Sequence, residues 1–215
     1  MMLKLEKINQ YYGQSHTLWD LDLEIKKGRC TCLMGRNGVG KTTISKVIMG
    51  LLPIKDGKII YEGNDISKLS DYQRAEIAIG YVPQGREIFS QLTVKENLEI
   101  GVMTNRNKIK KIPDKIYDLF PVLKDMANRK GGDLSGGQRQ RAFIAMVIAQ
   151  GTEYIFLDEP LNNLDMKNAS SMMKVLRNLC DELGKTIILV MHDINFTACY
   201  SDYIVALKDG KIARQ

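Results

Sequence analysis

The sequence predicts one α/β domain with a mainly parallel core sheet, a smaller antiparallel β subdomain and an inserted α-helical subdomain. Continuous apolar stretches, among them Tyr154–Leu157 and Thr186–Met191, alternate with helix-like stretches. This alternation is typical of parallel strands that helices cover on both faces. Near the N-terminus, Leu3–Ile8 and Leu18–Ile25 instead alternate apolar with charged residues, as half-exposed antiparallel strands do. A chain of 215 residues suits one large domain.

Turn residues divide the first part of the chain into short elements. Tyr11–Gly13 is expected to be a turn, and Arg29–Met34 a buried strand because it is short and apolar. Thr43–Gly50 is apolar at helical spacing and closes on glycine, which predicts a helix. The elements expected next are a strand over Gly57–Gly63, a helix over Ser70–Ile77 and a strand over Ile79–Val82.

Helix patterns dominate between residues 86 and 133. Thr93 to Met103 and Asp114 to Met126 are both helical in pattern, and Thr93-x-x-Glu96 is a capping box. We therefore predict a helical subdomain over 86–133, inserted into a core formed by 1–85 and 134–215. The second part of this core is expected to contain helices over Ser135–Gln150, Lys167–Leu183 and Asp193–Tyr200, and strands over Tyr154–Leu157, Thr186–Met191 and Tyr203–Leu207.

Composition favours a cytoplasmic protein. No stretch resembles a signal peptide, and no apolar run approaches the ~20 residues of a membrane-spanning helix. The four cysteines, Cys30, Cys32, Cys180 and Cys199, predict buried free thiols in a reducing compartment. The net charge of +6 and the basic residues between 106 and 111 are weak signs of nucleic-acid or membrane binding. We expect a solvated basic face and no nucleic-acid partner.

Residues 35–42 have the pattern G-x-x-x-x-G-K-T of a phosphate-binding loop, between a predicted strand and a predicted helix. Glycine lets the backbone turn tightly and point successive N–H groups at phosphate oxygens, and the helix N-terminus adds partial positive charge. Lys41 would contact the β and γ phosphates, and Thr42 would ligate Mg²⁺. A plain strand-to-helix turn is the alternative. The predicted ATP-binding residues of the loop are Gly35, Arg36, Asn37, Gly38, Val39, Gly40, Lys41, Thr42 and Thr43.

Two acidic residues follow the predicted strand Tyr154–Leu157. A carboxylate at the end of a buried strand can hold Mg²⁺ through water, and we assign this role to Asp158. The neighbouring Glu159 can accept a proton from an attacking water molecule. An ordinary acidic turn is the alternative, which the glycine loop upstream disfavours.

The stretch Leu134 to Gln138, LSGGQ, resembles the signature of ABC-type ATPases, which belong to the phosphate-loop NTPases. The resemblance covers essentially the whole chain. It implies that Tyr12 stacks on adenine, that Gln84 contacts Mg²⁺, water and the membrane partner, and that His192 contacts the γ-phosphate. It also places Asp165 in the D-loop over residues 162–165. Without the resemblance, Tyr12 would be a surface aromatic and His192 a structural histidine.

The same resemblance implies that two copies of the domain face each other head to tail around ATP and Mg²⁺. The signature residues acting on the other copy's γ-phosphate would be Leu134, Ser135, Gly136, Gly137 and Gln138. ATP would close a homodimer, or a heterodimer with another ABC ATPase, and hydrolysis by Glu159, with His192 and Gln84, would open it. The other implied partners are transmembrane permease subunits at the inner face of the cell membrane.

Two importer subfamilies are resembled by different parts of the chain. Tyr81–Phe89 and Tyr117–Leu123 resemble ATPases of urea and branched-chain amino-acid importers, whereas Gln138–Met146 and Tyr154–Asp165 resemble ATPases of iron-siderophore importers. The change suggests a chimeric or designed sequence. Partner choice runs through the region of Gln84 and the helical subdomain, so a urea, amide or branched-chain amino-acid importer is favoured over an iron-siderophore importer.

Two other functions are open to this chain. A non-transport ABC ATPase of DNA repair or translation is disfavoured. Members of the repair kind carry a long coiled-coil insertion before the signature, members of the translation kind carry two cassettes in one chain, and this chain resembles neither. An engineered or chimeric nucleotide-binding domain without a physiological transport partner is the alternative that the change in resemblance favours. Partner-stimulated ATP hydrolysis would distinguish an importer subunit from such a domain.

Overall fold

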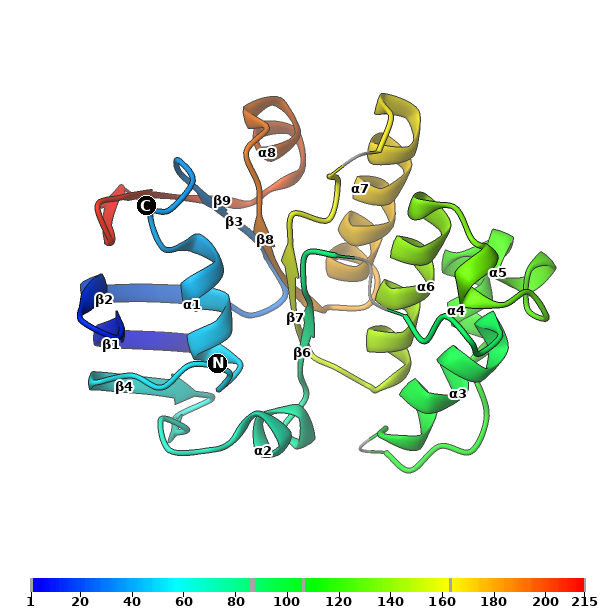
Figure 1. Cartoon of the computed structure of the whole chain (residues 1–215), viewed down its shortest axis with the longest axis horizontal. Coiled ribbons are helices and arrows are strands. Elements are labelled where there is room, and N and C mark those ends of the chain that lie inside the picture. Colours follow the sequence, from blue (N-terminus) through cyan, green and yellow to red (C-terminus); the bar gives the residue numbers. More distant parts are fainter. Residues whose placement is uncertain (1, 86–87, 106, 163, 215) are drawn as a thin grey trace.

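The computed structural model describes residues 2–85, 88–105, 107–162 and 164–214. Two sheets and a group of helices follow one another along the longest axis of the molecule (Figure 1). The antiparallel sheet lies at one end, the helices between residues 94 and 149 lie at the other, and the larger sheet lies between them. The predicted α/β fold with a mainly parallel core sheet and an antiparallel β subdomain is confirmed.

Four strands form the antiparallel sheet, in the order β2-β1-β4-β5. Their bounds are β1 Met2–Tyr12, β2 Ser15–Lys26, β4 Asp56–Tyr61 and β5 Asn64–Asp65. Leu3 pairs with Ile25, so the apolar residues of the two alternating stretches face one core. The predicted turn at Tyr11–Gly13 is wrong in part. Strand β1 continues through Tyr12, because both tyrosines pair with β2, and the turn begins at Gly13 with a φ of +59°.

Six strands form the larger sheet, in the order β10-β9-β3-β8-β7-β6. Their bounds are β3 Cys30–Met34, β6 Ile79–Val82, β7 Tyr154–Asp158, β8 Thr186–Val190, β9 Tyr203–Lys208 and β10 Lys211–Arg214. Every described pair of neighbours is parallel except β9 and β10. Strand β10, with little apolar content, was not predicted. Because β3, β6 and β7 are parallel, the segments that follow them meet at one edge of the sheet.

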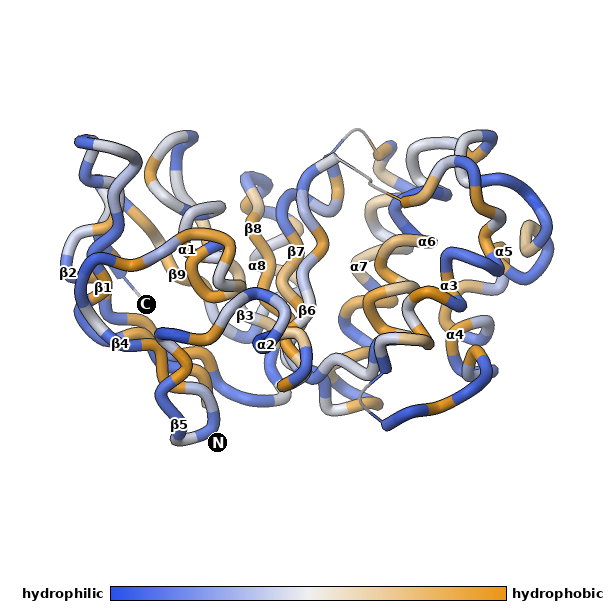
Figure 2. Tube along the Cα trace, turned by 60° about the horizontal axis from the view of Figure 1, so that its bottom comes forward, coloured by the Kyte–Doolittle hydropathy of each residue, from blue (hydrophilic) through white to orange (hydrophobic). Residues whose placement is uncertain are grey.

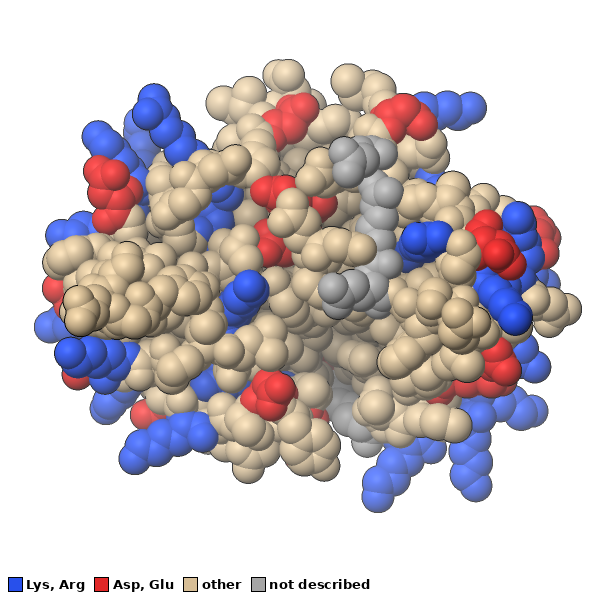
Figure 3. Space-filling model, in the orientation of Figure 1, with Lys and Arg blue, Asp and Glu red and all other residues tan. Residues whose placement is uncertain are grey.

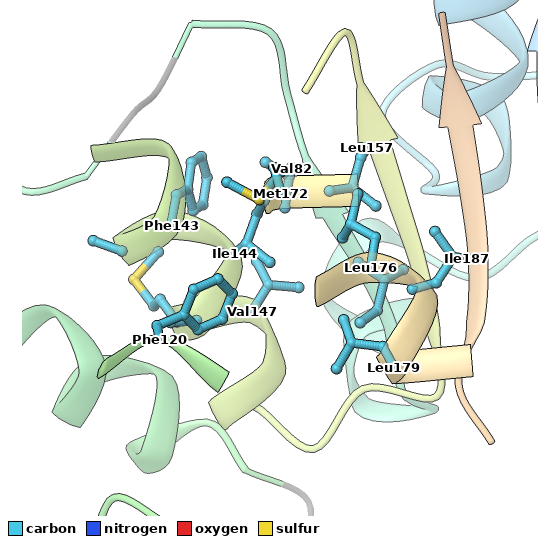
Figure 4. Packing of buried hydrophobic residues seen from close by; sticks show 14 of the residues in the cluster. Val82, Phe120, Phe143, Ile144, Val147, Leu157, Met172, Leu176, Leu179 and Ile187 are labelled. Carbon is cyan, nitrogen blue, oxygen red and sulfur yellow. The ribbon is translucent and has the colours of Figure 1, made fainter. Parts of the chain in front are cut away.

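Side chains of the parallel strands alternate between two cores, as the continuous apolar runs predict. Tyr154 and Phe156 face the core shared with the antiparallel sheet and helix α1 (Lys41–Ile48), whereas Leu157 faces the other helices. Figure 4 shows Leu157 and Leu176 meeting between β7 and the helices α6 and α7. Figure 2 shows apolar residues along these inner faces and hydrophilic residues in the outer loops. The bounds of the two core helices are α6 Gly136–Ala149 and α7 Met166–Asp181.

Helices make up most of the described part of residues 86–133. The bounds of the remaining helices are α2 Asp71–Glu76, α3 Val94–Met103, α4 Asp114–Leu119, α5 Pro121–Asp125, a 3₁₀ turn Gly131–Asp133 and α8 Ile194–Tyr200. The capping box at Thr93 and Glu96 is confirmed at the start of α3. The single helical stretch predicted over Asp114–Met126 is instead two helices, because Pro121 cannot continue a helix and starts α5. Residues 86–87 lie outside the described residues, and the subdomain boundary stays a prediction.

The molecular surface carries its basic side chains mainly toward the two ends of the view in Figure 3, while the middle shows few of them. Lys108, Lys110 and Lys111 are exposed, as expected of a solvated face, and Arg106 lies outside the described residues. Among the cysteines, Cys199 is exposed, whereas the other three are buried as predicted, and all are free thiols. In the described part of the chain, no helix is long and apolar enough to cross a membrane.

A candidate nucleotide site at the edge of the parallel sheet

The loop between β3 and α1 has a conformation that requires glycine. Gly38 and Gly40 have φ angles of +82° and +104°, which residues with a Cβ rarely adopt. A Cβ at Gly40 would lie 2.7 Å from Leu18 Cδ2, and one at Gly35 would lie 2.6 Å from the carbonyl oxygen of Leu207. The loop therefore packs directly on strands of both sheets, and its glycines are needed for that close approach.

Lys41 begins α1 and folds back over the loop that precedes it. Its Nζ donates hydrogen bonds to the carbonyl oxygens of Gly35 and Arg36, both at 2.8 Å. Burial lowers the pKa of Lys41, while the carboxylates of Glu159 and Asp158 favour its charged form. Lys41 is thus a mostly buried cation held over the loop by exchangeable acceptors, and phosphate oxygens can replace such acceptors.

Asp158 ends β7 beside the first turn of α1, and hydroxyl groups donate to both of its carboxylate oxygens. Thr42 Oγ1 donates to Oδ1 at 3.1 Å, and the hydroxyl of Tyr81 donates to Oδ2 at 3.3 Å. Only 2% of Asp158 is exposed. This burial raises the pKa of Asp158, and the two hydroxyl donors oppose the rise because they stabilise the carboxylate.

Thr42 and Asp158 suit Mg²⁺ that arrives together with a nucleotide. Mg²⁺ prefers hard oxygen ligands and at such sites takes only one or two from the protein, the rest coming from phosphates and water. The described residues include no group of three or more His, Cys, Asp or Glu side chains that could hold a metal ion. Gln84, the third predicted ligand, donates its side-chain amide to Glu159 in this structure.

Glu159 follows Asp158, and side chains from three segments donate to its carboxylate. Gln84 Nε2 donates to Oε2 at 2.7 Å, and Asn162 Nδ2 donates to the same oxygen at 3.2 Å. His192 Nε2 forms a hydrogen bond with Oε1. Glu159 has a φ of +49°, and its backbone N–H donates to the carbonyl of Val190 at 3.0 Å. The carboxylate is therefore held in place by residues that follow β6, β7 and β8.

A cavity of about 700 Å³ gathers most of the predicted nucleotide-binding and catalytic residues. The predicted residues that line it are Tyr12, Asn37, Gly38, Gly40, Lys41, Thr42, Thr43, Gln84, Glu159 and His192. Tyr12 stands at the end of β1 and is 47% exposed. Val39 packs against the core, and Gly35 and Arg36 contribute the carbonyl groups that Lys41 contacts. The volume is in the range of small-molecule sites.

The signature stretch forms the start of helix α6. Ser135 is the N-cap: its hydroxyl accepts from Gln138 N at 3.3 Å, and Gln138 Oε1 accepts from Ser135 N at 2.9 Å. Leu134 is buried. Ser135, Gly136, Gly137 and Gln138 line a second cavity of about 650 Å³, together with Asp165. Within one chain, the signature and the phosphate loop therefore border different cavities.

Asp165 has a structural contact that the sequence pattern did not indicate. Its Oδ1 accepts from Asn168 N at 2.8 Å, which makes Asp165 the N-cap of α7. Asn168 Oδ1 in turn accepts from Arg141 of α6 at 2.7 Å. The predicted D-loop is thus linked to the signature helix through Asn168. Asn163, in the same predicted loop, lies outside the described residues.

Three residues of the site were not predicted to act there: Thr17, which lines the cavity, and Asn162 and Tyr81, which contact the two carboxylates. Asn162 lay in the predicted D-loop without a role, and its spacing of three residues from Glu159 is a turn signal that could have indicated the contact. Tyr81 lies on β6 and contacts Asp158 on the neighbouring strand β7. That contact depends on β6 lying beside β7, and no local pattern in the sequence gives the order of the strands.

Known proteins similar to this chain are ATP-binding transport subunits. A family model described as "ABC transporter" matches residues 18–162. The petrobactin import ATP-binding protein YclP of Bacillus subtilis (strain 168) is 40% identical over an alignment that covers 100% of this chain and 86% of that protein. The probable branched-chain amino acid transport ATP-binding protein LivF of Archaeoglobus fulgidus is 36% identical, over 99% of this chain and 90% of its own length.

Solved structures of ATP-binding cassettes are similar to this chain over nearly its whole length. The ATP-binding cassette MJ0796, in a dimeric post-hydrolysis state bound to ADP and Pi, superposes with a TM-score of 0.86 at 30% identity, over 99% of this chain and 97% of that one. Both sequence relatives also align with 99% or more of this chain, across the point where the resemblance was predicted to change. The suggestion of a chimeric or designed sequence therefore receives no support.

Proposed function

The chain belongs to the ABC transporter family, as an ATPase whose hydrolysis of ATP is coupled to transport, and we propose that it is the ATPase subunit of an importer. The observation that carries the proposal is the convergence of Lys41, Asp158 and Glu159 on one site. Lys41 and Glu159 line the same cavity, and Asp158 bonds to Thr42 in its wall. A phosphate-binding cation, a metal-binding carboxylate and a proton acceptor are the groups that ATP hydrolysis requires.

ATP is proposed to bind with its phosphates on the glycine loop and its adenine against Tyr12. Lys41 would exchange the carbonyl oxygens of Gly35 and Arg36 for phosphate oxygens, which form stronger, charge-assisted hydrogen bonds. The exposed ring of Tyr12, at the rim of the same cavity, offers a π face for stacking. The N-terminus of α1 points at the same loop and favours an anion there.

Thr42 and Asp158, with Gln84, are proposed to hold Mg²⁺. When bound, the ion would neutralise negative charge on the phosphates. The hydroxyl of Thr42 can go on donating its hydrogen bond to Asp158 while a lone pair on its oxygen binds Mg²⁺. The hydrogen bond in this structure is therefore compatible with metal binding.

Glu159 is proposed as the general base, assisted by Gln84 and His192. The side chains of Gln84, Asn162 and His192 all form hydrogen bonds with its carboxylate. Before Glu159 accepts a proton from the attacking water, one of its oxygens must exchange a donor for that water. Gln84 is the donor that stands nearest in sequence to the predicted helical subdomain, so we propose that the membrane partner acts on the base through Gln84.

Lys41→Ala is expected to weaken ATP binding about 10–100-fold, because charge-assisted hydrogen bonds contribute about 1.5–3 kcal/mol. Isothermal titration calorimetry with ATP measures the change. Lys58→Ala is the control, since Lys58 is an exposed lysine of β4, and it should leave the affinity unchanged. Equal ATP affinities of the two variants would contradict the role of Lys41.

The working unit is proposed to be a head-to-tail dimer. Two features of this chain support it: the signature lines a cavity that the phosphate loop does not line, and the 14-residue helix α6 begins there, so its N-terminus favours an anion. A second copy could therefore place its nucleotide between its phosphate loop and the signature of the first. The dimeric state of the similar cassette MJ0796 is a further argument. Whether the partner is identical or a related ATPase depends on the importer.

Ser135→Arg is expected to bind ATP as a monomer and to fail in dimer closure, because the long cationic side chain fills the space that the other copy's nucleotide would enter. Light scattering with ATP and Mg²⁺, in the Glu159→Gln background, measures dimerisation. Ser135→Ala separates the effect of bulk from that of the lost hydroxyl: it loses the same helix cap, worth about 1 kcal/mol, without adding bulk, and should dimerise more strongly than the arginine variant. Dimers of the arginine variant would refute the arrangement.

For the cargo, we place an iron–siderophore complex first. YclP and the petrobactin import ATP-binding protein FatE of Bacillus anthracis are each 40% identical to this chain, compared with 36% for LivF. A urea, amide or branched-chain amino-acid cargo, favoured by residues 81–89 and 117–123, is the second candidate. In either importer, permease subunits would hold the chain at the inner face of the membrane.

The importer proposal is tested by reconstitution in proteoliposomes. ATP hydrolysis is measured with the chain alone, with the membrane subunits of a petrobactin importer and with those of a branched-chain amino-acid importer. Stimulation by the subunits of the petrobactin importer supports a siderophore cargo. Stimulation by the subunits of the amino-acid importer instead supports branched-chain amino acids as the cargo. Hydrolysis that neither set stimulates would favour a nucleotide-binding domain without a transport partner of these kinds.

A further inference from the structure

We propose that Tyr81 is a positioning residue for the metal-binding carboxylate: its hydroxyl holds Asp158 in the orientation that a divalent cation bound with ATP requires. The inference rests on the proposed function, because it concerns the same nucleotide site. Tyr81 opens the stretch Tyr81–Phe89 that resembles importer ATPases, but the sequence predicted no role for it at the nucleotide site. The contact is the hydrogen bond from the Tyr81 hydroxyl to Asp158 Oδ2 at 3.3 Å.

The strand pairing explains how Tyr81 reaches this carboxylate. Strand β6 is parallel to β7, and Tyr81 stands opposite Phe156 in the register. Side chains two residues apart on a strand share a face, so Phe156 and Asp158 lie on the same side of β7. A tyrosine is long enough to span the diagonal from the position opposite Phe156 to the end of the strand. Tyr81 therefore meets Asp158 at the sheet edge, where the nucleotide cavity begins.

Tyr81 and Thr42 together determine the plane of the carboxylate. Thr42 donates to Oδ1 and Tyr81 to Oδ2, so Asp158 is gripped by one donor on each oxygen. Without the donor from Tyr81, the hydrogen bond from Thr42 restrains Oδ1 more than Oδ2, so the plane of the carboxylate is less constrained. Because Asp158 is 2% exposed, bulk water is poorly placed to replace a missing donor. Groups that orient a metal ligand in this way typically change metal affinity about 10–100-fold when removed.

Tyr81 differs in its target from Gln84, which follows it by three residues. Tyr81 contacts Asp158, whereas Gln84 contacts Glu159. Tyr81 on β6 and Gln84 just after β6 thus bond to the two neighbouring carboxylates, Asp158 at the end of β7 and Glu159 directly after it. Loss of the Tyr81 hydroxyl should therefore affect the cation and leave the proton acceptor in place. This separation predicts a change in metal affinity with little change in the maximal rate of hydrolysis.

Tyr81→Phe tests the inference, because it removes the hydroxyl and keeps the ring. Mn²⁺ binding to the complex with the non-hydrolysable analogue AMP-PNP is followed by electron paramagnetic resonance. The affinity for Mn²⁺ is expected to fall about tenfold, while the affinity for AMP-PNP without metal stays unchanged. Tyr72→Phe is the matched control: the hydroxyl of Tyr72 donates to Glu76 Oε1 at 2.7 Å on the surface of α2, and its loss should leave Mn²⁺ binding as in the parent.

A second readout separates positioning from packing. In steady-state hydrolysis, Tyr81→Phe should raise the half-saturating Mg²⁺ concentration about tenfold, and excess Mg²⁺ should restore kcat to the parent level. A lowered kcat that excess Mg²⁺ does not restore, or Mn²⁺ binding within twofold of the parent, would overturn the role of Tyr81. If the parent chain itself binds neither AMP-PNP nor Mn²⁺, the proposed function fails together with the inference. If the parent binds AMP-PNP and Mn²⁺, and Tyr81→Phe binds Mn²⁺ equally strongly, only the inference is refuted.

Discussion

Glu159→Gln is expected to keep ATP binding and to lose about 10²–10⁴ in kcat, the contribution of a positioned general base. The amide has nearly the shape of the carboxylate but cannot accept a proton from water. Lys41, Thr42 and the glycine loop are unchanged, so the nucleotide affinity should stay within a few-fold of the parent. The rate is measured by phosphate release at saturating ATP and Mg²⁺, and the affinity by calorimetry.

The same variant should accumulate as an ATP-bound dimer, because the step that opens the dimer is blocked. Light scattering after addition of ATP and Mg²⁺ detects this species. Glu99→Gln provides the control: Glu99 lies on α3, and its side chain is 45% exposed beside Lys95, so its charge is lost without effect on the site. If Glu159→Gln hydrolyses ATP as fast as Glu99→Gln, another group is the proton acceptor.

Arg74→Met is expected to lower the free energy of unfolding by about 3 kcal/mol, because it leaves buried carbonyl groups without their charged donor. Arg74 is 2% exposed, although it is an arginine. Its guanidinium donates to the carbonyl oxygens of Val47 at 2.6 Å, Ile48 at 2.8 Å, and Leu69 and Ser67 at 3.0 Å. The first two end helix α1, so Arg74 satisfies the C-terminus of the helix that starts at the phosphate loop.

Urea unfolding followed by circular dichroism gives this free energy. Arg29→Met serves as the control, because Arg29 is 56% exposed and its ion pair with Asp202 measures 3.7 Å. Exposed pairs of this kind contribute about 0–1 kcal/mol. Equal losses in the two variants would show that the carbonyl contacts of Arg74 add nothing to stability.

The parts of the site that the sequence predicted are contiguous segments with local requirements. The glycine loop is an example, since positive φ angles at Gly38 and Gly40 are needed for the turn itself. The helix that starts at Ser135 is another, because a serine hydroxyl followed three residues later by glutamine can form a capping box, as it does here. The strand ending at Asp158 was predictable because four apolar residues precede the carboxylate.

The errors and omissions have physical reasons of two kinds. The first kind is local. At Pro121 the helical pattern competes with the break that proline causes, and at Tyr12 a turn competes with continuation of strand β1. The contact of Arg74 with α1 joins residues 26 and 27 positions apart. Its sequence neighbourhood describes an ordinary surface helix, so burial of the arginine follows only from the packing of α2 against the end of α1.

The sequence by itself determined the α/β class, the ATP-binding cassette family and the residues proposed for hydrolysis, because these depend on residue type and spacing within short segments. Only the tertiary structure decided which side chains share a carboxylate. Tyr81 and Thr42 on Asp158, and Gln84, Asn162 and His192 on Glu159, come from segments that meet because their strands are adjacent and parallel. Strand order is a property of the whole folded chain, and these contacts therefore appear only when the sheet has formed.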